Sequence, residues 1–137
     1  MDARSPRDLP MPARIVLVHD APEILGPAVA ALKAAGQDVA MFEDPMAALS
    51  VLEGRHHVEL LITGVIFALG KPNGLTLALM ARHMRPPAPP TRAEMKVLFI
   101  ARAEYREYTA GVGEFLDTPV SIPDLVAAVD ALMPQTG

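Results

Sequence analysis

Short apolar runs alternate with amphipathic segments along most of this chain. Apolar residues that recur every three to four positions predict helices over about residues 23–36, 44–53, 73–84 and 121–133. Branched aliphatic runs predict five short strands, over residues 14–19, 38–42, 58–63, 96–101 and 114–116. Strands that alternate with helices indicate an α/β fold with a parallel sheet covered on both faces.

Residues typical of helix ends support these boundaries. Asp44 precedes a proline, Asn73 precedes a glycine, and Ser121 is followed three residues later by an acid, so each is a candidate N-cap. Pro27 lies inside the first predicted helix, where a proline removes a backbone donor and crowds the preceding turn. We therefore expect an irregular first turn, or a helix that begins near Gly26.

Composition and charge narrow the function classes. The chain has 137 residues, a net charge of −4, 51% hydrophobic residues and no cysteine. These values favour one globular domain without disulfides or thiol chemistry, and they argue against nucleic-acid binding. No segment has the length of a membrane span, and residues 1–12 lack the apolar core of a signal peptide. We expect a soluble, cytoplasmic protein with a disordered tail over 1–12, a domain over 13–134 and a short tail over 135–137.

Four segments occur in an order and spacing that identify a family. They read IVLVHDAP, LLITGVIFALGKPNGLTLA, KVLFIARA and EFLDTPVSIPDL. Over residues 14–133 they resemble the receiver domain of bacterial response regulators. The resemblance implies a CheY-like, flavodoxin-like fold: a doubly wound, five-stranded parallel sheet with strand order 2-1-3-4-5. The stretch between Ala101 and Thr118 is shorter than in the family, so we expect a shortened or missing fourth helix.

The same resemblance assigns five positions to a phosphorylation pocket. Receivers accept a phosphoryl group on an aspartate, with Mg²⁺ held by an acidic pair and with a hydroxyl and a lysine that bind the phosphoryl oxygens. Asp20 keeps the family's residue type. The other four positions depart from it: His19 in the acidic pair, Gly64 as the nucleophile, Ala101 as the hydroxyl and Thr118 as the lysine. We expect a degenerate pocket with no catalytic residue, no cofactor, and no metal site beyond a weak remnant at Asp20.

Neighbouring residues offer few substitutes for the missing groups. Successive strand residues point to opposite faces, so Thr63 is expected to point away from the pocket. The same argument applies to Asp117, although it is weaker near the end of a strand. We interpret His19 as a remnant hydrogen-bonded to nearby backbone, in preference to a metal ligand or an acid–base group. The apolar loop over 65–70 either folds over a vacant pocket, which we favour, or displays Phe67 or Leu69 to a partner.

Tyrosine and arginine residues gather between the fourth and fifth strands. The segment holds both tyrosines of the chain, and such residues are common at contact hot spots. The alternative interpretation is that these are ordinary loop tyrosines covering an edge of the core. Phe115 aligns with the family's switch aromatic. The candidate interaction face therefore consists of Arg102, Tyr105, Arg106, Tyr108 and Phe115.

Three functions remain open at this stage. We favour a non-enzymatic, stand-alone receiver that binds a protein partner or a second copy of itself without phosphorylation, because the chain stops soon after Met133. The first alternative is a receiver phosphorylated at a non-standard residue in a two-component phosphorelay. The second is a flavodoxin-like binder of a small ligand, which the acid and proline after the first strand disfavour. Neither nucleic acid nor a membrane is an expected partner.

Overall fold

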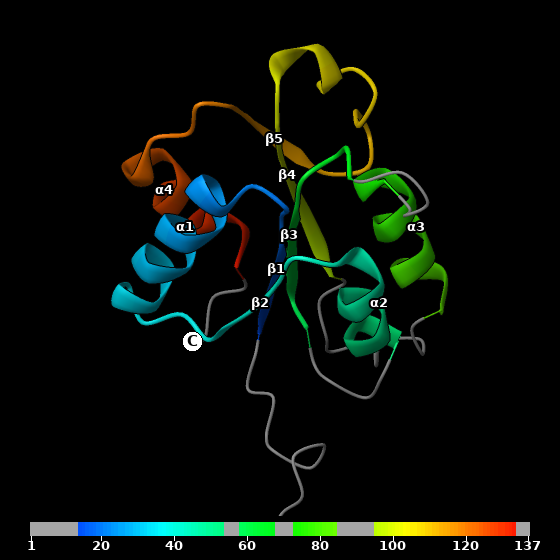
Figure 1. Cartoon of the computed structure of the whole chain (residues 1–137), viewed down its shortest axis with the longest axis horizontal. Helices are drawn as coiled ribbons and strands as arrows, with labels where there is room; N and C mark the ends of the chain where they lie inside the picture. Colours follow the sequence, from blue (N-terminus) through cyan, green and yellow to red (C-terminus); the bar gives the residue numbers. More distant parts are fainter. Residues whose placement is uncertain (1–13, 54–57, 68–72, 85–94, 134–137) are drawn as a thin grey trace, which may run out of the picture.

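The computed structural model describes residues 14–53, 58–67, 73–84 and 95–133. Five parallel strands form one sheet in the order β2-β1-β3-β4-β5, which confirms the expected order (Figure 1). The strands are β1 (Ile15–Val18), β2 (Val39–Phe42), β3 (Leu60–Thr63), β4 (Lys96–Ala101) and β5 (Glu114–Asp117). The two expected tails lie outside the described residues.

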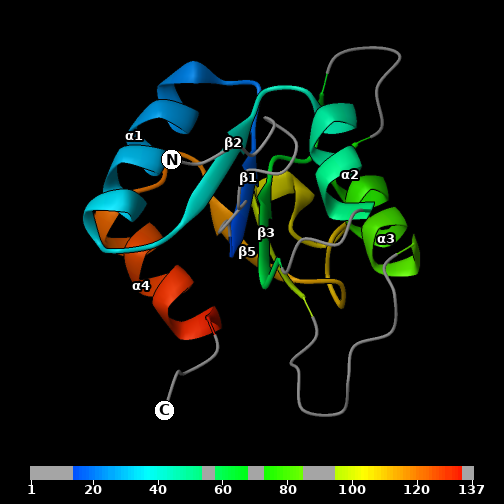
Figure 2. The ribbon, with the colours of Figure 1, turned by 90° about the horizontal axis from the view of Figure 1, so that it is seen from below.

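Helices cover the sheet on both faces. They are α1 (Pro22–Ala34), α2 (Pro45–Glu53), α3 (Gly74–Met84) and α4 (Ile122–Leu132). Seen along the sheet, α1 and α4 lie on one face, and α2 and α3 lie on the other (Figure 2). Within the described parts of the chain, no helix combines the length and the apolar character needed to traverse a bilayer.

Alternating side chains of the central strands build two separate cores. In β1, Val16 and Val18 pack toward α2 and α3, whereas Ile15 and Leu17 pack toward α1 and α4. All four side chains are at most 1% exposed. A parallel strand between two helical layers must be apolar on both sides, which explains the continuous hydrophobic runs of the sequence.

Side-chain caps begin three of the four helices where the sequence predicted them. The Asn73 Oδ1 atom accepts a hydrogen bond from Thr76 N–H at 2.8 Å, and the Ser121 Oγ atom accepts one from Asp124 N–H at 3.2 Å. Asp44 caps α2 in the same way, through Met46 N–H. Each cap gives a partner to a backbone donor that has none within the helix.

The start of α1 differs from the expectation. The helix begins at Pro22 and continues through Pro27, so neither an irregular first turn nor a start at Gly26 is correct. Pro22 stands in the first turn, where its fixed φ suits the helix and its missing N–H costs nothing. Pro27 removes one intrahelical donor to the carbonyl of Glu23. Both residues are exposed, so water can hydrate that carbonyl.

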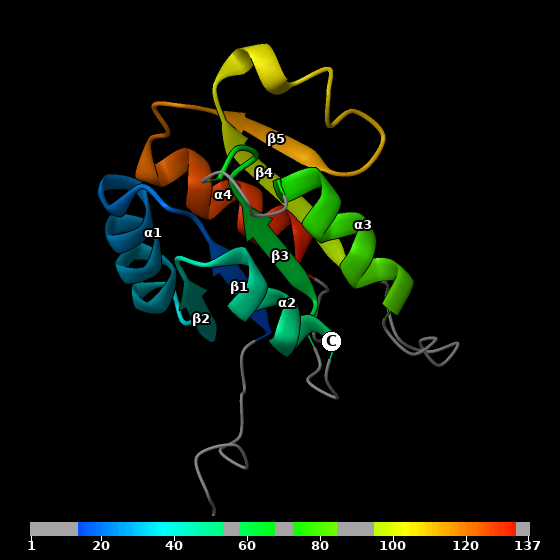
Figure 3. The same cartoon turned by 45° about the vertical axis from the view of Figure 1, so that its right-hand side comes forward.

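The connection between β4 and β5 contains no α-helix. A single 3₁₀ turn spans Ala103–Tyr105, and further turns continue to residue 112. The segment extends above the carboxyl ends of the strands before it returns to β5 (Figure 3). This confirms the prediction that the fourth helix of the family pattern is shortened or missing.

Candidate functional site

The ends of β1 and β3 bring two of the five pocket positions together. Val18 pairs with Thr63, and the Gly64 N–H donates to the Val18 carbonyl at 3.1 Å. His19 and Gly64, the next residue on each strand, therefore leave the sheet side by side. Ligands of open parallel sheets bind beyond this edge.

The ends of β4 and β5 bring two further positions together. Ala101 pairs with Asp117, and the Thr118 N–H donates to the Ala101 carbonyl at 2.9 Å. Neither of these two pocket positions, Ala101 and Thr118, carries an amine or a carboxylate. The His19 ring joins the two halves, because its Nε2 atom lies 3.3 Å from the Ile100 carbonyl oxygen.

The His19 imidazole is buried and satisfied by backbone on both sides. The Ala21 N–H donates to Nδ1 at 3.1 Å, so Nδ1 is an acceptor and the ring proton lies on Nε2, where it donates to Ile100. Burial lowers the pKa of His19 below its ordinary value of 6.5, although the Ile100 carbonyl and the charges of Asp20 and Glu23 act in the opposite direction. The neutral ring is therefore the form that fits, which confirms the interpretation of a backbone-bonded residue.

The ring occupies the space next to Gly64 that a side chain would need. A Cβ atom built on Gly64 would lie 3.0 Å from both Cδ2 and Nε2 of His19 and 3.5 Å from Cε1. The two distances of 3.0 Å are shorter than an ordinary van der Waals contact, and the distance of 3.5 Å is an ordinary one. The imidazole of His19 therefore takes up part of the space that a side chain at position 64 would need, and we call this arrangement the filled pocket.

The described part of the apolar loop, residues 65–67, packs partly into the core, and the prediction of a cover over 65–70 stays untested. Val65 is 1% exposed and packs into the core under α2 and α3, and Phe67 packs partly against the same core. Ile66 is 54% exposed. The nearest atoms to the missing side chain of Gly64 belong to His19. Residues 68–70 lie outside the described chain.

The start of α3 encloses Gly64 from another side. A Cβ atom on Gly74 would lie 1.7 Å from the Gly64 carbonyl oxygen, so position 74 must be glycine for this approach. The Gly74 N–H donates to the Val65 carbonyl at 2.7 Å. The Thr63 hydroxyl is buried and donates to the Gly64 carbonyl at 2.8 Å, so it contacts backbone and not the pocket.

The residues at this edge do not fit the Mg²⁺ ion that the family resemblance implies. Mg²⁺ prefers several oxygen ligands in an octahedral arrangement. Asp20 is the single carboxylate of the five positions; its side chain is 48% exposed and lies 3.8 Å from His19 Nδ1. Both nitrogens of His19 are engaged by backbone. In the residues that the structure describes, no three histidine or acidic side chains come close enough to hold a metal ion.

Asp117, the acid next to Thr118, forms an ion pair with Arg106 and is not a further candidate ligand for Mg²⁺. Its Oδ1 atom accepts a hydrogen bond from the Arg106 guanidinium at 2.5 Å. The same guanidinium lies 4.9 Å from the centre of the Phe115 ring, within cation–π range. One arginine therefore links the 102–113 segment to β5. Nothing in the sequence predicted these contacts of Arg106 with Asp117 and Phe115 beyond the presence of the three residue types.

The two tyrosines have different environments. Tyr105 is partly buried and packs against the core under α2 and α3, as the covering interpretation expected. Tyr108 is 50% exposed, and its hydroxyl accepts a hydrogen bond from Asn73 Nδ2 at 2.9 Å. Arg102 extends into solvent and pairs with Glu104 at 2.7 Å. The candidate interaction face therefore lies beside the filled pocket.

Sequence reasoning missed the complementarity between His19 and Gly64. A signal was present, because a large residue and a glycine follow two strands that are adjacent in the expected order. When His19 and Gly64 are compared one at a time with the family pattern, each counts only as the loss of a functional side chain. The structure shows one coupled arrangement, in which the missing side chain makes room for the ring.

Comparisons with known proteins agree with this architecture. No family model matches the sequence, and no curated protein matches it. Among solved structures, the receiver domain of the hybrid histidine kinase CckA is 30% identical, with a TM-score of 0.65, over 88% of this chain and 98% of that one. The receiver domain of NtrX from Brucella abortus has 19% identity and a TM-score of 0.72, over 86% and 96%.

The chemotaxis protein CheY4 of Vibrio cholerae shares the fold as well, with 17% identity and a TM-score of 0.69 over 87% of this chain and 97% of that one. At these lower identities the likeness establishes the fold. The similarity to the CckA domain spans nearly the whole of that domain. This chain therefore belongs to the receiver-domain family of two-component signalling.

Proposed function

We propose that this receiver domain acts as a non-enzymatic binding module whose signal does not pass through phosphorylation of its own pocket. One observation carries the proposal: the His19 ring lies 3.0 Å from where the Cβ of a residue-64 side chain would be. A carboxylate that accepts phosphorus needs that space and a neighbouring metal ion. Here a neutral ring lies in that space, and its hydrogen-bond partners are one backbone donor, the Ala21 N–H, and one backbone acceptor, the Ile100 carbonyl.

The surroundings of the pocket support the same conclusion. Phosphorylation changes a receiver when the phosphoryl group binds two conformations with different affinity. Ala101 and Thr118 offer no amine for such a group, and Phe115 is held by Arg106. We propose that Arg102, Tyr105, Arg106, Tyr108 and Phe115 belong to the face that meets a partner protein or a second copy of the chain. A cytoplasmic location stays a prediction of the sequence.

To test whether the pocket can be phosphorylated, the protein is treated with a phosphoryl donor and with an analogue of the phosphoryl group. ¹⁵N-labelled protein is recorded with Mg²⁺ alone, then with beryllofluoride and Mg²⁺, and intact mass is measured after incubation with acetyl phosphate. We expect unchanged amide shifts at residues 19–20, 64 and 101 and no added phosphoryl mass. Shifts clustered there, or a phosphoryl group mapped to Asp20 or Asp117, would instead support phosphorylation at a non-standard residue.

A matched control makes a negative result informative. The CckA receiver domain, treated in parallel, reports whether the reagents are active. A further variant of this chain, carrying His19→Asp and Gly64→Asp, removes the ring and returns carboxylates to both positions. New Mg²⁺-dependent shifts in that variant, absent from the wild type, would assign the difference to the filled pocket.

A further inference from the structure

The carboxyl end of the sheet displays apolar side chains around the filled pocket. Among the described residues, six large apolar side chains are more than a third exposed. Two of them, Met41 and Leu79, lie within β2 and α3. The other four lie at the end of the sheet where ligands of α/β folds bind. They are Met46, Ile66, Tyr108 and Ile122.

Hydrogen bonds connect the start of α3 to Tyr108 and to Val65, the neighbour of Ile66. The carbonyl of Val65, next to Ile66, accepts from Gly74 N–H at 2.7 Å. The side chain of Asn73 donates to the Tyr108 hydroxyl at 2.9 Å. Two partly buried rings, of Phe67 and Tyr105, pack on the same core beneath them. We call Ile66, Phe67, Tyr105 and Tyr108 the rim patch.

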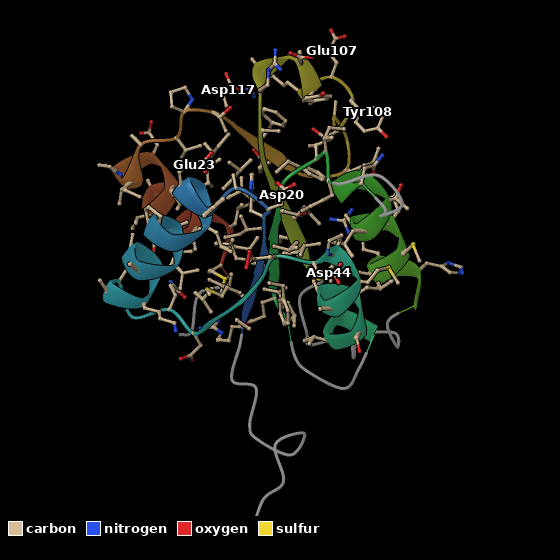
Figure 4. The ribbon with its side chains drawn as sticks, in the orientation of Figure 1. Asp20, Glu23, Asp44, Glu107, Tyr108 and Asp117 are labelled. Atoms are coloured by element: carbon tan, nitrogen blue, oxygen red, sulfur yellow. The ribbon has the colours of Figure 1, made fainter. Side chains whose placement is uncertain are left out.

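Among the described residues, acidic side chains outnumber basic ones at the end of the sheet that carries the rim patch. Figure 4 shows Glu107 and Asp117 near Tyr108 at one end of the molecule, with Glu23 and Asp20 lower and Asp44 beside α2. At this end of the sheet the described residues include eight acidic side chains, from Asp20, Glu23, Glu43, Asp44, Glu104, Glu107, Asp117 and Asp124. Two basic side chains lie at this end within the described parts of the chain, and each is paired: Arg102 with Glu104, and Arg106 with Asp117.

The opposite end of the sheet is balanced in charge. Its described side chains include four acids and four bases: Asp38, Glu59, Glu114 and Asp130, with Arg14, Lys33, Arg82 and Lys96. The acidic excess of the described domain is therefore concentrated around the rim patch. Such asymmetry steers a partner of opposite charge and fixes its orientation.

We infer that the rim patch docks a positively charged, amphipathic segment of a partner protein. This inference rests on the proposed function and adds the chemistry of the partner. Apolar side chains of that segment pack on Ile66 and Tyr108, and its lysine or arginine side chains face the surrounding acids. Aromatic centres ringed by charge are typical of binding hot spots. An acidic segment, or a nucleic acid, is repelled by the same field.

The probe is a helical peptide of about 18 residues made from leucine and lysine on opposite faces, and its counterpart has glutamate in place of lysine. Each is titrated into ¹⁵N-labelled protein at about 50 mM and 300 mM salt. We expect the lysine peptide to shift amides of residues 66–67, 73–76 and 104–110, with binding that weakens as salt rises. We expect no saturable binding of the glutamate peptide.

Variants distinguish specific binding at the rim patch from non-specific hydrophobic binding elsewhere on the surface. Ile66→Ser and Tyr108→Ser should each weaken binding of the lysine peptide about tenfold, the loss expected when a central contact is removed. Leu79→Ser is the matched control, since Leu79 is 49% exposed on α3, and it should leave binding unchanged. Asp20→Asn with Glu107→Gln should reduce the salt dependence, whereas Asp38→Asn with Asp130→Asn should not.

Three outcomes overturn the inference: no binding of the lysine peptide, equal binding of both peptides, or shifts centred outside the rim patch. None of them bears on phosphorylation, because no phosphoryl donor is present. Conversely, beryllofluoride-dependent shifts would refute the proposed function while leaving the peptide result intact. The wild-type titration does not depend on any variant folding correctly.

Discussion

Replacing Gly64 by alanine tests whether His19 truly occupies the space beside it. The φ angle of Gly64 is not positive, so alanine meets no backbone strain there. The added methyl would lie 3.0 Å from two ring atoms of His19. Overpacking of this kind costs about 1–3 kcal/mol, and the stiffer unfolded chain offsets about 0.4–1 kcal/mol. We expect a net loss of about 1–2 kcal/mol, or about 4–8 °C in Tm.

The assay is a double-mutant cycle of thermal and urea unfolding on wild type, Gly64→Ala, His19→Ala and the double variant. Without the ring, the methyl meets no close contact, so Gly64→Ala should become neutral or slightly stabilising. The coupling free energy should therefore reach about 1.5 kcal/mol or more. Gly26→Ala is the control, because nothing lies within 4 Å of its added methyl in α1, and it should stabilise the protein. An equal effect of Gly64→Ala in both backgrounds would refute a filled pocket.

Three further predictions follow from the same contacts. Burial lowers the pKa of His19 below its unfolded value of 6.5, so the unfolded chain binds more protons and stability should fall as pH drops through 6.5 toward the folded pKa. His19→Asn should lose this slope, and an NMR titration midpoint at or above 6.5 in the folded protein would contradict the prediction. Asn73→Ala removes the cap of α3 and the bond to Tyr108; we expect a loss of about 1 kcal/mol and faster amide exchange over 103–112. Tyr108→Phe, which removes the bond alone, should speed exchange without changing the amides of α3. Gly74→Ala places a methyl 1.7 Å from the Gly64 carbonyl oxygen and should cost more than about 3 kcal/mol in urea unfolding; a loss below 1 kcal/mol would show that α3 can shift.

Local rules were sufficient for most of the fold. The apolar run at 58–63 predicted a strand buried on both faces, and β3 has that environment because helices lie on both sides. Asn73 and Ser121 predicted helix starts correctly, since a cap depends on residues within one turn. Pro27 misled the prediction, because the strain of a proline near a helix start falls on an exposed carbonyl that water can reach.

The candidate site was predicted less completely, because it depends on contacts between strands. Sequence reasoning assigned five positions to a pocket, and the structure places them at the carboxyl ends of β1, β3, β4 and β5. It did not show that the imidazole of His19 faces Gly64 or that the Ile100 carbonyl accepts a hydrogen bond from the ring, since residue 100 is distant in the chain. The Arg106 stack on Phe115 was missed for the same reason. Side-chain direction at a strand end is decided by tertiary packing and not by local pattern.

A filled pocket also changes where regulation of this domain can act. In a two-state receiver, a ligand shifts the equilibrium only by its difference in affinity for the two states. If the imidazole of His19 already satisfies its surroundings, a phosphoryl group must first displace a buried ring and break its bonds to Ala21 and Ile100. Leaving those backbone groups unpaired costs about 1–3 kcal/mol each, before any gain from binding. On the proposed function, the occupancy of the rim patch then depends on partner concentration and ionic strength, and these are the variables that control the signal.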